Sequence, residues 1–310
     1  MNETRIHPQV AVLIPCYNES ATLPQVIKDF KLHLPHAQIY VYDNGSSDNS
    51  VEIARAAGAF VKHVPLRGKG QVVRRMFADI EANVYVMVDG DATYDAASAQ
   101  KAIDLLQHNS LDMVVCTRKP RDDKSFPPGH VFGNKLFTRT VNLLFGHQFT
   151  DIFSGYRVFS HRFVKSFPAI SQGFEIETEI TIHALQLCLP SAEIETIYQE
   201  RPPGSTSKLK TFKDGFRILR TILLLFLYVR PMAFFGILFI LLSILTLILG
   251  LPITITFLQT GLVPRLPTAI LAVSSGLLAS LCLACGIILD SVSRSRLETK
   301  RCWYLIAASM

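Results

Sequence analysis

Residues 84–95 read VYVMVDGDATYD, an apolar run followed directly by Asp89, Gly90 and Asp91. A short, continuous apolar run that ends in polar residues is typical of a buried strand. Two carboxylates separated by one small residue can approach a single divalent cation, and Mg²⁺ or Mn²⁺ is usually held by one or two carboxylates together with substrate phosphates. Because a D-x-D sequence by itself is more often a solvated turn, its interpretation as a metal site depends on the neighbouring sequence.

Apolar runs of the same kind recur along the first 120 residues. They are VAVLIP (10–15), QIYVYD (38–43), AFVKHV (59–64) and LDMVVCT (111–117), and amphipathic segments such as 20–34 and 98–108 separate them. This alternation predicts an α/β domain with a mostly parallel, Rossmann-like sheet, whose ligands bind at the carboxyl ends of the strands. Polar clusters stand at these ends: PCYNE, DNGSSDNS, RGKG and DGDATYD. We therefore expect one site there, with Asp89 and Asp91 as its metal ligands.

Two further residues in these clusters have both a functional and a structural interpretation. Asp43 can accept a hydrogen bond from a nucleotide base or a ribose hydroxyl. Alternatively, DNGSSDNS is a turn in which Asp48 is the N-cap of the next helix. Lys69 in RGKG is either a phosphate contact ahead of a helix N-terminus or a solvated loop lysine.

The charge of the chain is unevenly distributed. The formal net charge is +6, but residues 1–200 hold 19 basic and 22 acidic side chains and residues 201–310 hold 12 and 3. The basic part is also the most apolar part, which indicates positive charge beside a membrane and not a nucleic-acid surface. Cys282 and Cys285 lie in an uncharged apolar run and are expected to be membrane-helix residues, with a redox pair as the alternative.

Two uncharged segments, 231–258 and 266–289, each exceed the roughly 20 residues that a transmembrane helix needs. The short connection 259–265 makes them a hairpin. Basic residues concentrate on the outer flanks, and no secretory signal is visible at the N-terminus. The positive-inside bias therefore predicts a multi-pass protein of the inner, cytoplasmic membrane with its N-terminal domain in the cytoplasm.

Segment 211–230 has apolar residues at helical spacing beside a basic stripe. We expect an amphipathic helix that lies at the membrane surface, the alternative being a helix packed on the soluble domain. The predicted organisation is a catalytic domain (1–210), this helix (211–230), the two spans, and a cytoplasmic tail (290–310).

The motifs IPCYNE, YDNGSSDNS, RGKG, DGD, SGYR and ERPPGSTSK, in this order and before a two-span hairpin, resemble family 2 glycosyltransferases of the GT-A fold. The resemblance covers residues 8–300 and is greatest to polyprenyl-phosphate glycosyltransferases such as dolichyl-phosphate mannose synthases and bactoprenol glucosyltransferases. It implies nucleotide-sugar contacts at Pro15, Tyr17, Asn18, Glu19, Asp43, Lys69, Asp89, Gly90, Arg201 and Lys208. It also makes Asp91 the better metal ligand of the DGD sequence.

The resemblance assigns the acceptor side of the site as well. Arg118 and Arg139 match positions that hold the lipid phosphate, although either is alternatively an ordinary surface arginine. Asp151 matches a residue proposed as catalytic base, but an anionic acceptor needs no strong base, so Asp151 is alternatively a charge-balancing residue. Glu177 is either a sugar contact or a carboxylate favoured by a helix N-terminus.

The implied activity is an inverting transfer of a hexose from a nucleotide-sugar to undecaprenyl or dolichyl phosphate, with Mg²⁺ or Mn²⁺ as cofactor. UDP-glucose is favoured as donor over GDP-mannose. Expected partners are the donor, the lipid, the membrane and further copies of the chain, and no nucleic acid. A processive polysaccharide synthase is disfavoured because Trp303 is the only tryptophan and a Q-x-x-R-W motif is absent. The intact motifs also disfavour a catalytically silent adaptor.

Overall fold

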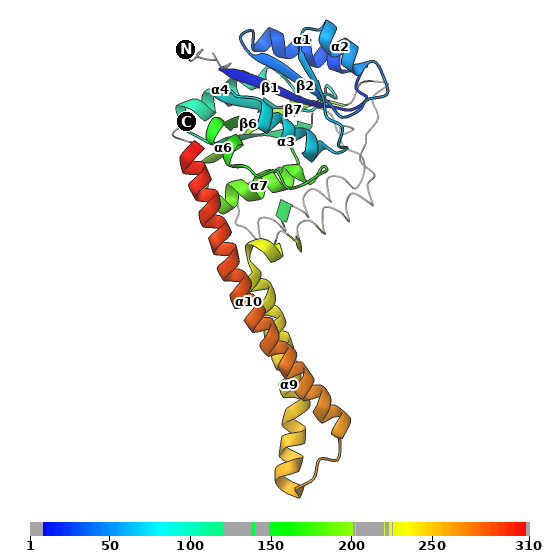
Figure 1. Ribbon diagram of the computed structural model, residues 1–310, viewed down its shortest axis with the longest axis vertical. Coiled ribbons are helices and arrows are strands. Elements are labelled where there is room, and N and C mark those ends of the chain that lie inside the picture. The colour runs from blue at the N-terminus through cyan, green and yellow to red at the C-terminus, as the bar shows by residue number, and fades with distance from the viewer. Residues whose placement is uncertain are drawn as a thin grey trace. The chain divides into compact units, whose positions relative to one another are not determined.

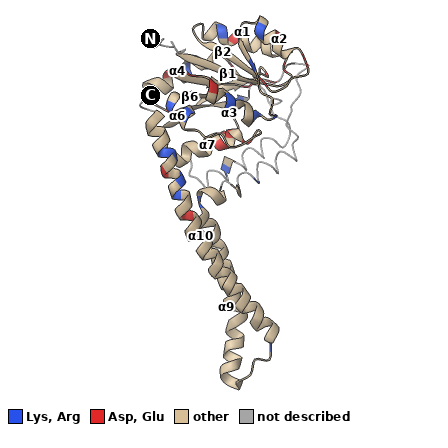
Figure 2. Cartoon of the chain, in the orientation of Figure 1, with Lys and Arg blue, Asp and Glu red and all other residues tan. Residues whose placement is uncertain are grey.

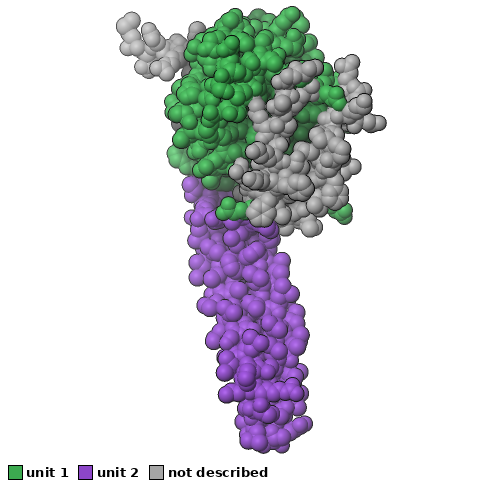
Figure 3. Space-filling model, turned by 90° about the vertical axis from the view of Figure 1, so that its right-hand side faces the viewer, with its two compact units in different colours: residues 1–221, 300–310 green, residues 222–299 purple. Residues whose placement is uncertain are grey.

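The computed structural model describes residues 9–120, 138–139, 149–200, 202, 220, 223–224 and 226–307. The chain forms two compact units, one of residues 1–221 and 300–310 and the other of residues 222–299 (Figure 3). The first unit contains the sheet and all the polar clusters at its strand ends, and the second contains the two long apolar helices (Figure 1).

The first unit is built on a seven-stranded sheet of order β3-β2-β1-β4-β6-β5-β7. Its strands are β1 (Val10–Cys16), β2 (Gln38–Asp43), β3 (Phe60–His63), β4 (Val84–Met87), β5 (Met113–Pro120), β6 (Arg157–Ser160) and β7 (Ser191–Tyr198). All neighbouring strands are parallel except at β6, which is antiparallel to β4 and β5. The predicted α/β fold with a mostly parallel sheet is confirmed, and the five apolar runs form five of its strands.

Helices pack against this sheet. They are α1 (Leu23–His33), α2 (Ser50–Ala56), α3 (Lys69–Asp79), α4 (Ser98–His108), α6 (His161–Ser166) and α7 (Ile176–Leu187). In α1 the residues Leu23, Val26, Ile27 and Phe30 are buried, which is the spacing of one helix face. The expected amphipathic segments 20–34 and 98–108 are thus confirmed as α1 and α4. The interior of the sheet is apolar, as in β1, where residues 11–14 are all fully buried.

The strand register brings the polar clusters to one edge of the sheet. Cys16 pairs with Asp43, and Asp43 pairs with His63, so the chain leaves β1, β2 and β3 at the same level. Since β6 is antiparallel, it begins at this edge, where Arg157 lies between Met87 of β4 and Val115 of β5. We call this the strand-end edge.

The second unit consists mainly of α9 (Pro231–Thr260) and the part of α10 (Leu266–Ala307) that ends at residue 299. Both helices are long and apolar enough to cross a membrane. Between them, Thr246 Oγ1 and Ser275 Oγ lie 2.8 Å apart, and a Cβ on Gly276 would lie 3.3 Å from Thr246. Small residues therefore let the two helices approach closely. Figure 2 shows charged residues on the sheet domain and the last part of α10, and none along α9.

The final turns of α10 belong to the first unit. Lys300 Nζ donates to Gln186 Oε1 at 2.9 Å, and Tyr304 Oη donates to Asp112 Oδ2 at 2.7 Å. The segment predicted as a tail is therefore helical through Ala307. Most of segment 211–230 lies outside the described residues, and its placement at a membrane surface stays a prediction. Cys282 and Cys285 lie in α10 and are free thiols.

Candidate active site

The loops after β1 and β2 are joined by hydrogen bonds at the strand-end edge. The main-chain N–H of Asn18 donates to Ser46 Oγ at 2.8 Å, and the N–H of Ser47 donates back to Asn18 Oδ1 at 2.7 Å. Asn18 has φ of +51°, a conformation that asparagine tolerates better than most residues. The IPCYNE and DNGSSDNS motifs thus form one structure.

Asp43 is 3% exposed at the end of β2. Its carboxylate accepts hydrogen bonds from the main-chain N–H groups of Gly45 and Ser46, each at 3.0 Å, and its Oδ2 lies 3.1 Å from His63 Nδ1. Burial by itself would raise the pKa of Asp43, but the hydrogen bonds from Ser46, His63 and Gly45 outweigh it and lower the pKa. Asp43 is therefore a fixed, ionised acceptor.

The predicted N-cap role of Asp48 is wrong by one residue, because α2 has Asn49 at this position. Asp48 Oδ1 instead accepts from the N–H of Ser50, the first residue of the helix, at 3.1 Å. Asp48 Oδ2 accepts from the N–H of Ser20 at 3.1 Å. Its carboxylate therefore ties the β1 loop to the start of α2.

The RGKG loop runs so close to a neighbouring loop that side chains would not fit. Gly68 has φ of +124°, and a Cβ there would lie 2.1 Å from the main-chain oxygen of Gln172. Arg67 donates to the main-chain oxygen of Asn44 at 2.6 Å, and its guanidinium lies 4.6 Å from the ring centroid of Tyr17. The sequence motifs did not predict this contact between Arg67 and Tyr17.

Lys69, the first residue of α3, is buried between two carboxylates. Its Nζ donates to Asp89 Oδ1 and lies 2.6 Å from Glu177 Oε1. Burial would lower the pKa of Lys69, but the charges of Asp89 and Glu177 outweigh it and raise the pKa. Burial and the charge of Asp89 raise the pKa of Glu177, while Lys69 acts in the opposite direction. The alternative of a solvated Lys69 is therefore wrong. To contact a phosphate, the Lys69 ammonium would have to break one of these two ion pairs or bind the phosphate in addition to them.

The DGD sequence is tightly enclosed. A Cβ on Gly90 would lie 2.2 Å from Glu19 Oε2, and a Cβ on Gly155 would lie 2.3 Å from Asp89 Oδ2. Asp91 is 3% exposed, and its Oδ1 accepts from Thr93 Oγ1 at 2.6 Å. Glycine at these two positions therefore lets Glu19 approach the backbone of the DGD sequence and lets Asp89 approach the backbone of the segment before β6.

Two carboxylates with oxygen ligands suit Mg²⁺ or Mn²⁺ when substrate phosphates complete the coordination. Asp89 and Asp91 therefore fit a divalent cation of this kind. Within the described part of the chain, no cluster of three or more His, Cys, Asp or Glu side chains has the arrangement of a metal site.

Arg118, near the end of β5, forms a two-pronged ion pair with Asp151. Nε and Nη2 of Arg118 each lie 2.7 Å from a different oxygen of Asp151. Burial would raise the pKa of Asp151, but the charge and hydrogen bonds of Arg118 lower it. An ionised carboxylate held in this way is a weak proton acceptor, so the structure favours charge balance over base catalysis for Asp151.

Of the other residues assigned to the phosphates, the structure describes only Arg139. Arg139 is exposed in a two-residue described segment. Arg201 and Lys208 lie outside the described residues. Their roles, and that of Arg118 toward a lipid phosphate, stay predictions.

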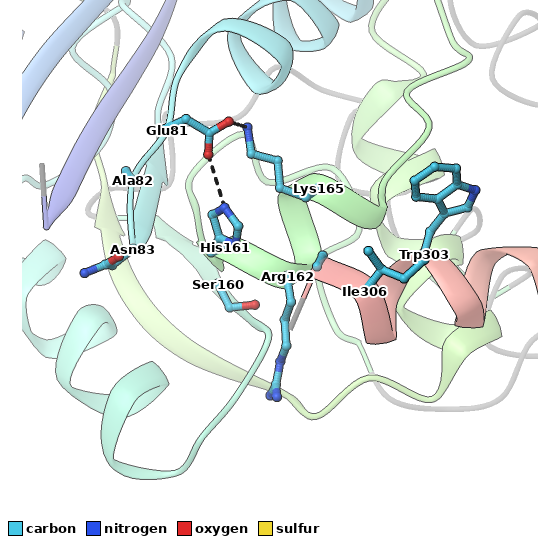
Figure 4. A pocket seen from close by; sticks show the side chains of 10 residues that line it. Glu81, Ala82, Asn83, Ser160, His161, Arg162, Lys165, Trp303 and Ile306 are labelled. Carbon is cyan, nitrogen blue, oxygen red and sulfur yellow. Dashed lines mark hydrogen bonds and ion pairs between the residues drawn. The ribbon is translucent and has the colours of Figure 1, made fainter. Parts of the chain in front are cut away.

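A hollow of about 640 Å³ lies elsewhere on this unit, between α6 and the end of α10 (Figure 4). Its lining includes Glu81, His161, Lys165 and Trp303. Lys165 forms an ion pair with Glu81, and His161 Nε2 lies 3.2 Å from Glu81 Oε2. Glu81 precedes β4, whereas the DGD sequence follows β4, so this hollow is at the opposite end of the strand from the candidate site.

The sheet and strand-end clusters define a GT-A glycosyltransferase fold. A solved structure with this fold, the glucosyl-3-phosphoglycerate synthase of Mycobacterium tuberculosis with Mn²⁺, UDP and glucosyl-3-phosphoglycerate, has a TM-score of 0.59 at 20% identity and covers 70% of this chain and 80% of that chain. At this identity the likeness shows the fold alone.

Sequence comparison identifies the family. The model of glycosyl transferase family 2 matches residues 11–167, half of the chain. Glycosyltransferase AglJ of Haloferax volcanii is 35% identical over 238 residues, 73% of this chain and 75% of AglJ. The chain therefore belongs to glycosyl transferase family 2, as the motifs predicted.

Other relatives match smaller shares of the chain. An uncharacterized protein of Shigella flexneri is 54% identical over 152 residues, 49% of this chain and 93% of that protein. A dolichyl-phosphate hexose transferase of Haloferax volcanii is 27% identical, covering 69% of this chain and 92% of that protein. An undecaprenyl-phosphate 4-deoxy-4-formamido-L-arabinose transferase of Shewanella sediminis is 26% identical, covering 64% and 61%. The predicted resemblance to polyprenyl-phosphate glycosyltransferases is thus confirmed.

Proposed function

We propose that this protein is a membrane-bound, inverting glycosyltransferase that moves a hexose from a nucleotide-sugar to a polyprenyl phosphate. The observation that carries the proposal is the strand-end edge itself. There Asp89 of the DGD sequence pairs with Lys69, and Arg118 of β5 pairs with Asp151. One side of this edge suits a diphosphate and the other an anionic acceptor. Relatives named for dolichyl-phosphate and undecaprenyl-phosphate substrates support this assignment.

The donor would bind across the ends of β1 to β4. Asp43 is fixed as an acceptor for a base N–H or a ribose hydroxyl, and Arg67 with Tyr17 offers a flat surface beside it. UDP-glucose is the proposed donor over GDP-mannose, in line with the UDP bound in the Mycobacterium tuberculosis structure.

Asp89 and Asp91 would hold Mg²⁺ or Mn²⁺, which when bound would neutralise the departing diphosphate. Lys69 would share its positive charge with the same phosphates, because it already neutralises Asp89. Glu177, on the other side of Lys69, would accept hydrogen bonds from sugar hydroxyls. Binding the donor in this way would restrict the sugar to one orientation before the reaction.

The acceptor determines what the remaining residues need to do. A polyprenyl phosphate is anionic at neutral pH, so its oxygen attacks the anomeric carbon directly, opposite the leaving diphosphate, and inverts the configuration. No proton has to be removed. Arg118 would orient this phosphate, and Asp151 would balance part of the positive charge of Arg118 and hold its guanidinium in place. The apolar α9 and α10 would hold the enzyme in the cytoplasmic membrane, where its lipid acceptor resides.

The direct test is to incubate membranes that contain the protein with labelled UDP-sugars and GDP-sugars, and to identify the lipid-extractable product by mass spectrometry. A hexosyl-phosphate polyprenyl made from UDP-glucose supports the proposal in full. A product made only from GDP-mannose would keep the reaction and change the donor. The absence of a lipid-linked product with every donor would overturn the proposed function.

A further inference from the structure

Arg157 is the largest fully buried side chain of the strand-end edge, with 0% exposure at the start of β6. Three hydrogen bonds to oxygen atoms hold its guanidinium, and Nη1 also donates a weaker one to Met113 Sδ at 3.6 Å. Nη2 donates to the main-chain oxygen of Ile152 at 2.7 Å, and Nε donates to that of Ser154 at 2.9 Å. Nη1 donates to Thr181 Oγ1 of α7 at 2.9 Å. All three acceptors are uncharged, which is unusual because a buried cation is normally paired with a carboxylate.

These three acceptors belong to two different parts of the site. Ile152 and Ser154 belong to the segment that begins with Asp151, the partner of Arg118. Thr181 lies one helical turn after Glu177, and its hydroxyl donates to the main-chain oxygen of Glu177 at 3.0 Å. Arg157 therefore connects the Asp151 segment to the turn of α7 that places Glu177 against Lys69.

The connection also reaches the DGD sequence. Gly155, two residues before Arg157, leaves room for Asp89 Oδ2, which would lie 2.3 Å from a Cβ at this position. The N–H of Gly155 donates to Tyr94 Oη at 2.9 Å, which ties this segment to the chain that follows the DGD sequence. A shift of the segment would therefore move the surroundings of Asp89 together with Asp151.

Charge adds a second link. Burial lowers the pKa of Arg157 to about 10, while the charges of Glu177 and Asp151 act in the opposite direction. The guanidinium thus interacts electrostatically with both carboxylates, although its own hydrogen bonds go to uncharged groups. By attraction at a distance it favours the ionised form of both.

We propose that Arg157 is a positioning residue that fixes the distance and orientation between the Asp151 segment and Glu177, and so sets the alignment of acceptor and donor. This inference rests on the proposed glycosyl transfer. Arginine is required here because its planar fork reaches three acceptors in fixed directions, whereas a lysine ammonium on a flexible stem does not reproduce that geometry.

The test uses the full-length protein and three variants at this cluster. Arg157→Lys keeps the charge and loses the fork, Arg157→Met loses both, and Thr181→Val removes one acceptor while Arg157 stays. Arg162→Lys is the matched control, because Arg162 is an arginine just beyond the other end of β6 that pairs with Asp112, away from the strand-end edge. Circular dichroism and melting curves establish that each variant is folded.

Steady-state transfer separates positioning from a general loss of structure. We expect Arg157→Lys to lower kcat about 10- to 100-fold with KM for the donor changed less than about threefold, because misplacement by about 1 Å costs up to about 100-fold. Thr181→Val should show the same kcat effect at a smaller size, and Arg162→Lys should stay within about twofold of wild type. In Arg157→Met the acidic limb of the pH profile should move to higher pH, since removal of a cation raises the pKa of nearby carboxylates.

Hydrogen exchange provides a readout that does not depend on the donor. Amides of residues 151–155 and 176–181 should exchange faster in Arg157→Lys than in wild type. In Arg162→Lys the exchange rates of these amides should equal those of wild type. The proposal is overturned if Arg157→Lys retains kcat within about twofold, or if both segments keep wild-type exchange. If Arg157→Met does not fold, Arg157→Lys and Thr181→Val decide the outcome. A wild-type protein without lipid-linked product would overturn the proposed function instead, and the exchange result would still decide whether Arg157 holds the two segments together.

Discussion

The two halves of the strand-end edge hold their charges in different ways. In the β1–β4 half, Asp43 and Asp91 accept hydrogen bonds from main-chain N–H and hydroxyl groups, while Asp89 pairs with Lys69. In the β5–β6 half, Asp151 is matched by Arg118, and Arg157 lies behind them. Uncharged donors fix a carboxylate and leave its negative charge in place, whereas an ion pair cancels it. The first half is therefore suited to a cation and its diphosphate, and the second to an anionic acceptor.

The largest expected effect is on transfer when the charge of Asp91 in the β1–β4 half is removed. Asp91→Asn keeps the size of the side chain and the contact with Thr93 but removes the charge. We expect transfer to fall about 100- to 1,000-fold with little change in melting temperature, as when one preorganised electrostatic contact is lost. Asp95→Asn is the matched control, since Asp95 binds the N–H of Ala97 near the start of α4. Equal losses in both variants would contradict the metal-site assignment.

The second prediction concerns Lys69, the cation that pairs with Asp89 in the β1–β4 half. Lys69→Met leaves Asp89 and Glu177 close together without a counter-charge, and breaking a buried ion pair costs about 3–5 kcal/mol. We expect transfer to fall about 10- to 100-fold and the melting temperature to drop. Added Mn²⁺ should then raise the melting temperature of the variant more than that of wild type, because the cation replaces the lost charge. An equal rise in both proteins would show that Mn²⁺ binds elsewhere.

The strands and helices that the sequence predicted are those with strong apolar periodicity, such as β1, β4, α1 and α4. The short β6 has only four residues, and its apolar part is too brief to be recognised as a strand. The contacts of Lys69 depend on α7, more than 100 residues further along the chain, so local pattern did not predict them. Arg157 ends the SGYR motif, but the motif did not predict its role, because its burial results from the antiparallel insertion of β6 between β4 and β5.

The third prediction tests the β5–β6 half through Asp151. If Asp151 balances the charge of Arg118, Asp151→Asn should lower kcat only about 10-fold, below the 100- to 10,000-fold range of a general base. A loss of about 1,000-fold or more in kcat would favour base catalysis instead.

Acid melting tests the same ion pair independently. Because Arg118 lowers the pKa of Asp151, the stability that this carboxylate contributes is complete above its ordinary pKa of 3.8 and is lost as the pH falls through the lowered pKa. The melting temperature of Asp151→Asn should therefore fall less steeply than that of wild type below about pH 4. Parallel curves would contradict the pairing.

The smallest effect is expected behind the β5–β6 half, at His183 of α7. Burial against Phe163 and Phe167, together with the charge of Lys300, lowers the pKa of His183 to about 3 from 6.5. The unfolded chain therefore takes up a proton below pH 6.5 that the folded protein does not bind until near pH 3. The free energy of unfolding consequently decreases as the pH is lowered from 6.5 to about 3. In His183→Leu this slope should be reduced, with transfer at neutral pH unchanged. A variant with the wild-type slope would show that His183 is protonated in the folded protein.

The central claim is that the strand-end edge transfers sugar to a lipid phosphate. Its most direct test is to give purified wild-type protein and Asp91→Asn a labelled UDP-glucose with undecaprenyl phosphate and Mn²⁺ in detergent, and to measure the lipid-linked product by mass. Wild type should form a hexosyl-phosphate undecaprenyl of inverted anomeric configuration, and Asp91→Asn should form almost none. Equal amounts from both proteins, or release of free sugar in place of a lipid-linked product, would contradict the account.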